Sequence, residues 1–465
     1  MFRLMTNAYI KWQAWSATSI NRKIFSAATI IATMTLVTRL VFMIKEQIVA
    51  AKFGLSDSLD AFLLAFTINL FITNVITGAL NASVIPIYIR VKERDGKIAA
   101  ENLICNCMGW SLLTLSGITV VMYFTAPSFL PALASGFDKN KIELTLNIFI
   151  HLLPMILLYG IKAIWSSILN AGYRFALVAV TPILTPLTTA ILLLAVTKNV
   201  GTDVLVIGTI LGAILENIIL GTELKRRGAS LLPKWHRIDH DMVSVAKQFL
   251  PMVSATVLMC STTVVDQAMA AMLGPGSVSA LNYGYKVVGM IIGLATSALG
   301  TAVIPFFSSM VAKNNWLEIN NIIKRYLVII FVVTIPITIV LCFMSKGITH
   351  LLFERGTFTS SDTTIVSNVQ IYFALQIPFF IACILIVKLI SSMLLNYVLL
   401  IGNVVSVIVN VVLNYVFMRK YGVGGIALST SFVYIISFIF LFSVLLKVLK
   451  RQTIIYKDKD IYECK

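Results

Sequence analysis

The chain has 465 residues, of which 58% are hydrophobic and 12% are charged, and its formal net charge is +17. Soluble domains are about 45–50% apolar, so this composition, with a mean hydropathy of +0.91, excludes a soluble protein. The positive charge by itself would suit nucleic acid, but the basic residues cluster between apolar segments, so no nucleic-acid partner is expected.

Apolar segments of about 20 residues recur along the whole chain, and each is long enough to cross the roughly 30 Å hydrocarbon core of a bilayer. This pattern predicts an all-α polytopic membrane protein with about twelve transmembrane helices. In chain order, the spans are expected to begin near Lys23, Asp60, Asn102, Thr145, Val178, Val204, Met242, Ser277, Tyr326, Ile365, Tyr397 and Val423.

The basic residues between the spans are distributed unequally over the two faces of the membrane. Clusters at 90–97, 225–237 and 447–451 all fall on one face. Because cytoplasmic loops carry the excess of Lys and Arg, both termini are expected to be cytoplasmic in a multi-pass bacterial inner-membrane protein. The first 22 residues lack the apolar core and small-residue cleavage site of a signal peptide.

Two pairs of short segments repeat at nearly the same distance along the sequence. Residues Glu46–Gly54 and Asp266–Gly274 share an acid, Gln, two spacers, Ala-Ala, two spacers and Gly, and Ala79–Pro86 resembles Ala298–Pro305. Both pairs are separated by about 220 residues. Two matches in register predict a duplication of six helices. Because six is an even number, both halves enter the membrane from the same side and are parallel repeats. Transporters commonly arrange such repeats around a central substrate site.

The predicted division of the chain follows from this duplication. It comprises a cytoplasmic N-terminal segment at 1–22, a first lobe at 23–224, a basic cytoplasmic linker at 225–241, a second lobe at 242–449 and a cytoplasmic tail at 450–465.

Several charged residues fall inside apolar spans, where a charge costs about 2.5–3.5 kcal/mol near the bilayer centre and therefore usually faces a cavity or a partner. Arg39 is the sharpest case; Glu46 shares its helical face, and Lys45 lies slightly off it. The other candidates are Asp60, Lys162, Glu216, Asp266, Lys286 and Lys388.

These basic residues predict a central cavity for an anionic ligand, since Arg can grip a phosphate in bidentate fashion and Lys acts as a point charge. For Lys45, Asp60, Lys162 and Asp266, location at the membrane interface or structural pairing is the alternative. The acidic residues that are candidates for ion or proton coupling are Glu46, Glu216 and Asp266; for Glu216 a packing bridge is equally open.

No catalytic motif is found. The sequence contains no Walker A loop, GxSxG, HExxH or GxGxxG, so neither an enzyme nor a cofactor is expected. His236 and His240 are four residues apart but lie in a basic loop, and the six cysteines show no CxxC spacing, so no metal site is predicted. The energy for transport would come from the membrane potential or from a Na⁺ or H⁺ gradient.

The stretch Thr38–Gly54, continuing through Leu59–Phe66 and Val84–Pro86, resembles the MurJ/MviN group of the multidrug/oligosaccharidyl-lipid/polysaccharide (MOP) exporter superfamily. Weaker likeness extends over Leu169–Phe175 and Phe353–Thr359. This resemblance implies a V-shaped pair of six-helix lobes around a cationic cavity, which flips undecaprenyl-diphosphate-linked sugars from the cytoplasmic to the outer leaflet by alternating access.

Carried over by position, Arg39, Lys45 and Asp60 match family positions important for activity, and Lys286 falls where the family carries a basic residue. The implied context is peptidoglycan or polysaccharide biosynthesis and cell-wall biogenesis, with the glycan polymerase machinery as a candidate partner. The resemblance also shows departures. Murein lipid II flippases of this group usually have fourteen helices, and the second span shows Thr73 and Asn74 in place of basic residues.

The cargo is therefore left open between a lipid II-like peptidoglycan precursor and an O-antigen, capsule or exopolysaccharide unit. Two other functions are considered. A cation-coupled multidrug exporter of the same superfamily would favour acidic cavity residues, which is opposite in sign to Arg39. A membrane scaffold without transport activity would recruit partners through the basic loops.

Overall fold

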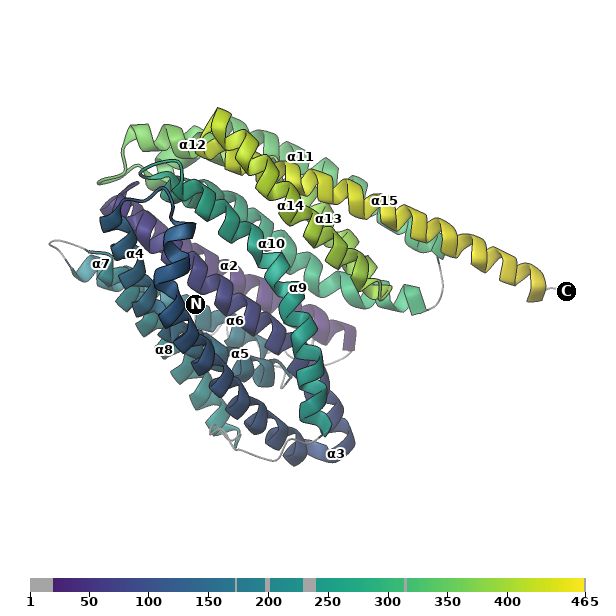
Figure 1. Ribbon diagram of the computed structural model, residues 1–465. Helices are drawn as coiled ribbons and strands as arrows, with labels where there is room; N and C mark the ends of the chain where they lie inside the picture. The colour runs from purple at the N-terminus through teal and green to yellow at the C-terminus, as the bar shows by residue number, and fades with distance from the viewer. Residues whose placement is uncertain (1–19, 172–173, 197–200, 229–239, 313–315, 464–465) are drawn as a thin grey trace, which may run out of the picture.

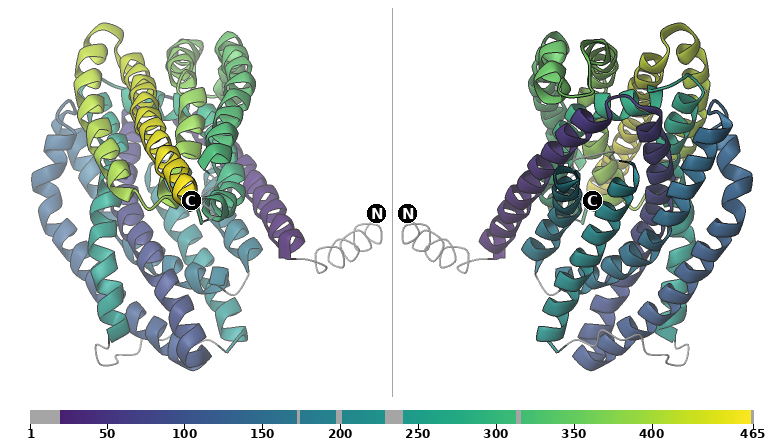
Figure 2. Two further views of the ribbon diagram at one scale, coloured as in Figure 1. Left: turned by 90° about the vertical axis from the view of Figure 1, so that its right-hand side faces the viewer. Right: turned by 90° about the vertical axis from the view of Figure 1, so that its left-hand side faces the viewer.

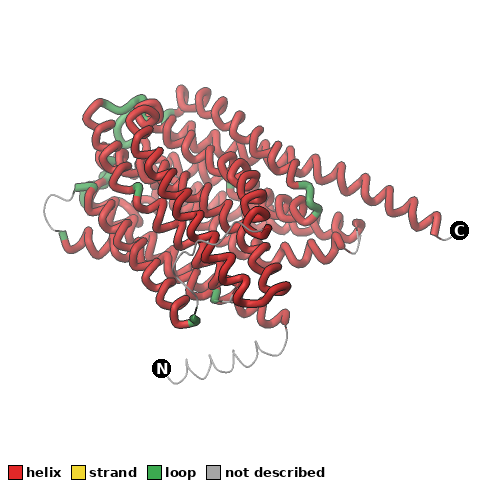
Figure 3. The backbone as a smooth tube through the Cα atoms, turned by 60° about the horizontal axis from the view of Figure 1, so that its bottom comes forward, coloured by secondary structure: helices red, strands yellow, loops and turns green. Residues whose placement is uncertain are grey.

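The computed structural model describes residues 20–171, 174–196, 201–228, 240–312 and 316–463, and within these ranges the chain is helical with no strand (Figure 3). Most of the expected N-terminal segment and of the basic linker, including His236, lies outside the described residues. The helices of the first half are α2 (Ile20–Phe53), α3 (Asp57–Leu133), α4 (Lys139–Leu152), α5 (Pro154–Ala171), α6 (Phe175–Val180), η1 (Thr181–Ile183), α7 (Leu184–Ala195) and α8 (Asp203–Arg226). Those of the second half are α9 (His240–Ala271), α10 (Ser277–Ala312), α11 (Trp316–Phe353), α12 (Ser360–Ala374), α13 (Ile377–Ser392), α14 (Asn396–Tyr421) and α15 (Val423–Glu463).

Eleven stretches of helix in the described part of the chain are long and apolar enough to cross a membrane. They match the expected spans from the second onward, and α2 covers the first. The predicted all-α polytopic class is thereby confirmed. They begin at Asp57, Ile98, Lys139, Phe175, Asp203, His240, Ser277, Glu318, Ser360, Asn396 and Val423.

The longest helix, α3, supplies two of these spans because it breaks at Gly96. This residue has φ +84° and ψ −177°, a conformation that only glycine adopts readily because it has no Cβ. The second and third spans therefore follow each other directly, without a loop of several residues between them.

The helices form two groups around a shared middle (Figure 1). Helices α3 to α8 gather below, α10 to α15 gather above, and α2 and α9 run between the two groups. The views in Figure 2 show the N-terminal part of α2 diverging from the bundle. Helix α2 of the first half contacts α10, and α9 of the second half contacts α3. These two helices therefore bring residues of both halves to one central region.

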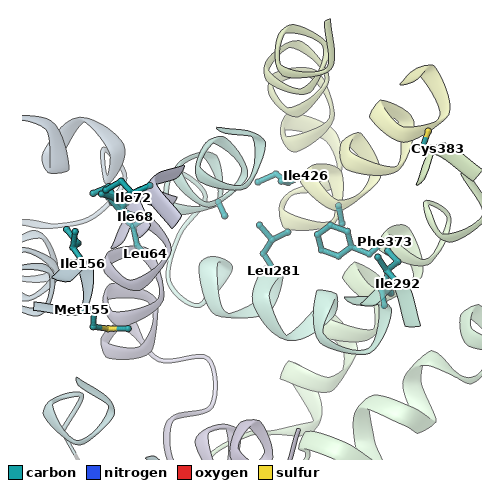
Figure 4. Close-up of a cluster of buried hydrophobic side chains, with 14 of the residues drawn as sticks. Leu64, Ile68, Ile72, Met155, Ile156, Leu281, Ile292, Phe373, Cys383 and Ile426 are labelled. Carbon is teal, nitrogen blue, oxygen red and sulfur yellow. The ribbon is translucent and has the colours of Figure 1, made fainter. Parts of the chain in front are cut away.

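Apolar side chains pack between neighbouring helices within each group (Figure 4). In the first half, Leu64 and Ile68 of α3 lie opposite Met155 of α5, and all three are at most 4% exposed. In the second half, Leu281 of α10 and Phe373 of α12 come together, both similarly buried. These buried faces hold the helices of each group together.

The two halves also meet through loops at one end of the molecule, at the left in Figure 1. We call it the closed end; it comprises the α2–α3, α9–α10 and α11–α12 turns. There Thr357 N–H donates to the carbonyl of Ala51 at 3.0 Å. Gly356 has φ +61°, and a Cβ on it would lie 2.2 Å from the Ala51 carbonyl oxygen. Only glycine allows this close approach between the halves.

Candidate functional site: a cavity between the halves

A cavity of about 410 Å³ lies between the two halves. Helices α2, α3, α7 and α8 line it from the first half, and α9, α10, α12 and α15 line it from the second. We call it the central cavity. Its charged and amide-bearing lining residues are Lys45, Glu46, Asn74, Asp266, Gln267, Asn282, Lys286 and Gln376.

A cluster of two lysines around one carboxylate forms the cationic part of this cavity. Glu46 Oε1 of α2 lies 2.5 Å from Lys45 Nζ and 3.2 Å from Lys286 Nζ of α10. The carboxylate is 5% exposed, whereas the two lysine side chains are 16% and 15% exposed. Both ammonium groups lie over the Phe42 ring, at 4.8 and 4.9 Å from its centroid. The cluster has a net charge of +1 and joins the two halves, and its lysines retain access to the cavity.

Arg39 extends this positive region along α2. It lines a second cavity of about 400 Å³ between α2 and α10, which shares Phe42, Tyr285 and Lys286 with the central cavity. A Cβ on Gly293 would lie 3.1 Å from Arg39 Nη2, so the glycine makes room for the guanidinium. The structure therefore brings Arg39, Lys45, Glu46 and Lys286 into one continuous region.

Asp266 of α9 lines the central cavity in a neutral environment. Its carboxylate accepts hydrogen bonds from Asn410 Nδ2 at 2.9 Å, Asn414 Nδ2 at 2.7 Å and Thr430 Oγ1 at 3.1 Å. It is 8% exposed, and within the described ranges no Lys or Arg forms an ion pair with it. A buried carboxylate held only by neutral donors keeps an uncompensated charge. It is therefore suited to bind a cation or a proton.

Asp60, which the sequence marked as a cavity residue, lies at the closed end and does not line the central cavity. It is fully buried and accepts hydrogen bonds from the main-chain N–H groups of Gly276 and Ser279 at 2.7 and 2.8 Å. The Ser279 hydroxyl donates to it at 2.6 Å, and Lys141 Nζ lies 3.0 Å away. Because these N–H groups are at the N-terminus of α10, the carboxylate also faces the positive end of that helix. Asp60 thus joins the first half to the second.

Lys162 and Glu216 form an ion pair with each other, within the first half. Glu216 is 1% exposed and also accepts a hydrogen bond from Thr185 Oγ1 at 2.6 Å. The Lys162 ammonium lies 4.9 Å from the centre of the Tyr159 ring. Neither member of the pair lines the central cavity, although Thr185 does. This is the packing bridge that the sequence left open for Glu216.

Lys388 of α13 lines neither the central cavity nor the cavity around Arg39. It is half-buried, among the apolar residues of its helix.

Sequence reasoning missed the partners of the acidic residues. Asn410 and Asn414 are four residues apart in an apolar helix, so they share a face, and this spacing was a usable signal. Lys141 lay outside the expected apolar spans, and its pairing with Asp57 and Asp60 had no signal in the sequence.

Comparison with known proteins places this architecture in a family. Residues 49–462 match the family model described as lipid II flippase MurJ. A probable lipid II flippase MurJ of Rickettsia prowazekii is 25% identical over 412 residues, which cover 88% of this chain and 81% of the relative. The corresponding protein of Vibrio cholerae is 23% identical over 426 residues, with 89% and 81% coverage.

Solved structures show the same fold. A lipid II flippase MurJ in an inward closed conformation superposes with a TM-score of 0.78 at 25% identity, covering 91% of this chain and 90% of its own. An inward-facing multidrug resistance MATE family transporter of the MOP superfamily has a TM-score of 0.75 at 13% identity, with 92% and 99% coverage. The chain therefore belongs to the MurJ family of lipid II flippases, a family of membrane transporters and not of enzymes.

Proposed function

We propose that this protein flips lipid II, an undecaprenyl-diphosphate-linked peptidoglycan precursor, from the cytoplasmic to the outer leaflet of the bacterial inner membrane. The observation that carries the proposal is the cluster of Lys45, Glu46 and Lys286, which reaches into a cavity between the halves from both sides. Arg39 adds a third cation next to it. Paired lysines and an arginine in a low-dielectric site suit a diphosphate, whose charges they neutralise.

The transport step follows from the position of the closed end. With both termini cytoplasmic, the closed end faces away from the cytoplasm, and the substrate enters from the cytoplasmic side. Alternating access then requires the contacts at Asp60 and Gly356 to separate while the opposite ends of the halves approach. The diphosphate would replace Glu46 as the partner of the two lysine ammonium groups, so that the lysine charges stay compensated throughout transport.

We further propose that Asp266 is the coupling site, at which a Na⁺ ion or a proton binds. The neutral oxygen and nitrogen partners on α14 and α15 surround the carboxylate without compensating its charge. A cation there would draw α9, α14 and α15 together. Its binding and release would bias the position of the helices that line the cavity.

Complementation of a flippase-deficient strain tests this proposal, with lipid II and O-antigen units assayed separately. Wild-type protein should restore lipid II export, whereas Arg39→Ala and Lys286→Ala should lose it at normal protein levels. Lys388→Ala is the matched control, because it removes a lysine within a span that lines neither cavity. If Arg39→Ala and Lys286→Ala both export normally, the cationic-cavity mechanism is wrong.

The same strains separate the other cargoes. Export of O-antigen units alone would assign a different undecaprenyl-linked glycan. Drug resistance on overexpression, without any effect on surface glycans, would instead support the multidrug exporter.

A further inference from the structure

Each half of the molecule holds a buried carboxylate next to its last two membrane spans and close to the central cavity. In the first half, Glu216 of α8 accepts a hydrogen bond from the hydroxyl of Thr185 on α7 at 2.6 Å. In the second half, Asp266 accepts one from the hydroxyl of Thr430 on α15 at 3.1 Å. Both threonines line the central cavity. The two sites therefore share a carboxylate, a threonine donor and a location at or directly behind the cavity wall.

The two sites differ in the charge that surrounds the carboxylate. Asn410 and Asn414 are the other partners of Asp266, so that site has a net charge of −1. Glu216 instead pairs through Oε2 with the ammonium group of Lys162 on α5, so the site in the first half is neutral. A buried carboxylate without a compensating charge is strongly destabilising. The first half supplies that charge from its own chain.

Close packing of α7 against α8 fixes the arrangement around Glu216. Gly212 lies one turn before Glu216, and a Cβ on this glycine would lie 2.4 Å from the Cα of Thr185. Small residues allow helices to approach closely, and here the approach brings the Thr185 hydroxyl to the carboxylate. On the other side, the Lys162 ammonium lies 4.9 Å from the centre of the Tyr159 ring. A carboxylate, a hydroxyl oxygen and an aromatic face together stabilise a positive charge at this point.

The position of Lys162 also closes the route to the carboxylate. The lysine side chain is 17% exposed, whereas that of Glu216 is 1% exposed. Truncation of the lysine to alanine would leave Glu216 next to an open space that the outer methylene groups and the ammonium had filled. Carboxylate and hydroxyl oxygens are the ligands that hard cations prefer, so a small cation from outside fits that space.

We propose that the Lys162 ammonium is a built-in cation, which occupies in the first half the kind of site that a mobile cation occupies in the second half. Because the ammonium is attached to α5, it cannot leave during transport, and the charge next to Glu216 stays constant. The protein then takes up a single cation in each cycle, at Asp266 alone. The inference rests on the proposed function, which assigns Asp266 as the coupling site.

The test counts the Na⁺ ions that bind to the purified full chain in lipid nanodiscs, by equilibrium dialysis with radioactive Na⁺. Lys162→Ala should bind one Na⁺ more than the wild type, whether Asp266 takes up Na⁺ or a proton. The additional ion should remain when Asp266→Asn is combined with Lys162→Ala. It should disappear when Glu216→Gln is combined with Lys162→Ala.

Lys162→Met is the matched control. Its thioether side chain fills most of the space of the lysine without a charge, so this variant should bind no additional Na⁺. Propylammonium carries the groups that Lys162→Ala lacks. It should displace the additional Na⁺ and raise the unfolding temperature of Lys162→Ala, and tetramethylammonium, which has no N–H donor, should do neither. Lys162→Ser leaves a similar space and takes the place of Lys162→Ala if that variant does not fold.

The two proposals fail in different ways. If Asp266→Asn keeps both the Na⁺ stoichiometry and the gradient response of the wild type, Asp266 is not the coupling site. If Glu216→Gln alone loses a Na⁺ ion that the wild type binds, a mobile cation already reaches Glu216 and the built-in cation is wrong. It is also wrong if Lys162→Ala and Lys162→Ser bind no more Na⁺ than the wild type and propylammonium does not stabilise them.

Discussion

Asp60 in the first half accepts hydrogen bonds from both the main-chain N–H and the hydroxyl of Ser279 in the second half. Substitution by Asn keeps the shape but removes the charge of the buried one of the two carboxylates that pair with Lys141. Breaking a buried pair on one side typically costs about 3–5 kcal/mol. We expect Asp60→Asn to open the closed end, as seen in faster labelling of a cysteine introduced at Ser58.

Asp57→Asn is the control for this experiment. Asp57 bonds to the same lysine at 2.5 Å, but its side chain is 58% exposed, and exposed pairs contribute little. Equal labelling of the Asp60→Asn variant and the wild type would show that Asp60 does not hold the closed end.

A second prediction concerns the charge of the lysine cluster. Glu46→Gln raises its net charge from +1 to +2 while keeping a hydrogen-bond acceptor. We expect undecaprenyl diphosphate to bind roughly tenfold more tightly, which corresponds to an added favourable interaction of about 1.4 kcal/mol. Transport should be slower, because the substrate is released less readily. Binding at low and at high salt, combined with a transport assay, would test this; weaker binding at both salt concentrations would contradict it.

A third prediction tests the space around Arg39. In Gly293→Val, the added Cβ would lie 3.1 Å from the Arg39 guanidinium, before the two methyl groups of Val are counted. The substitution should therefore displace Arg39 and reduce transport at least tenfold, which corresponds to about 1.4 kcal/mol of binding free energy. Gly347→Val in α11 is the matched control, because a Cβ there meets no atom within 4 Å. Equal transport by the two variants would exclude a role for this cavity.

The ion pair of Lys162 and Glu216 leads to a fourth prediction. Lys162→Met leaves Glu216 buried without its cation and should lower stability by about 3–5 kcal/mol. The double variant with Glu216→Gln should recover much of this loss, because neither charge remains. Thermal unfolding of the two single variants and the double variant forms the cycle; strictly additive effects would show that the pair does not couple.

Asp266 provides the fifth prediction. Asp266→Asn keeps the size of the side chain and should abolish the dependence of transport on an imposed Na⁺ or H⁺ gradient, because a neutral amide binds neither ion well. Transport into vesicles with and without each gradient measures this effect. Asp203→Asn, at the start of α8, removes an acid outside the cavity and should keep the wild-type response. An unchanged gradient response in Asp266→Asn would exclude this residue as the coupling site.

Much of the fold follows from local properties of the sequence. Apolar segments of span length locate the helices, because membrane crossing depends on length and composition alone. Arg39, Lys45 and Glu46 could be placed together because they lie on one helix with known periodicity. Lys286 could be recognised as a candidate cavity residue because a charge inside a membrane span costs free energy. Its ion pair with Glu46, however, depends on the packing of α10 against α2.

The contacts of the other charged residues depended on tertiary structure. Asp60 lies near a predicted span, and only folding brings the α9–α10 turn to it. Lys162 and Glu216 looked like separate cavity residues because nothing local shows that α5 packs on α8. The glutamines of the cavity wall gave no signal, since uncharged residues in spans occur equally at interhelical contacts.

Glu46 has a consequence for the unloaded protein. Two ammonium groups facing each other in a site poor in water repel strongly. Once the anionic substrate has left, they would have no counter-ion if Glu46 were absent. The carboxylate is a counter-ion that cannot diffuse away, so the two halves stay attracted to each other when the cavity is empty. The empty transporter can therefore return to its starting state without a dissolved anion from either side of the membrane.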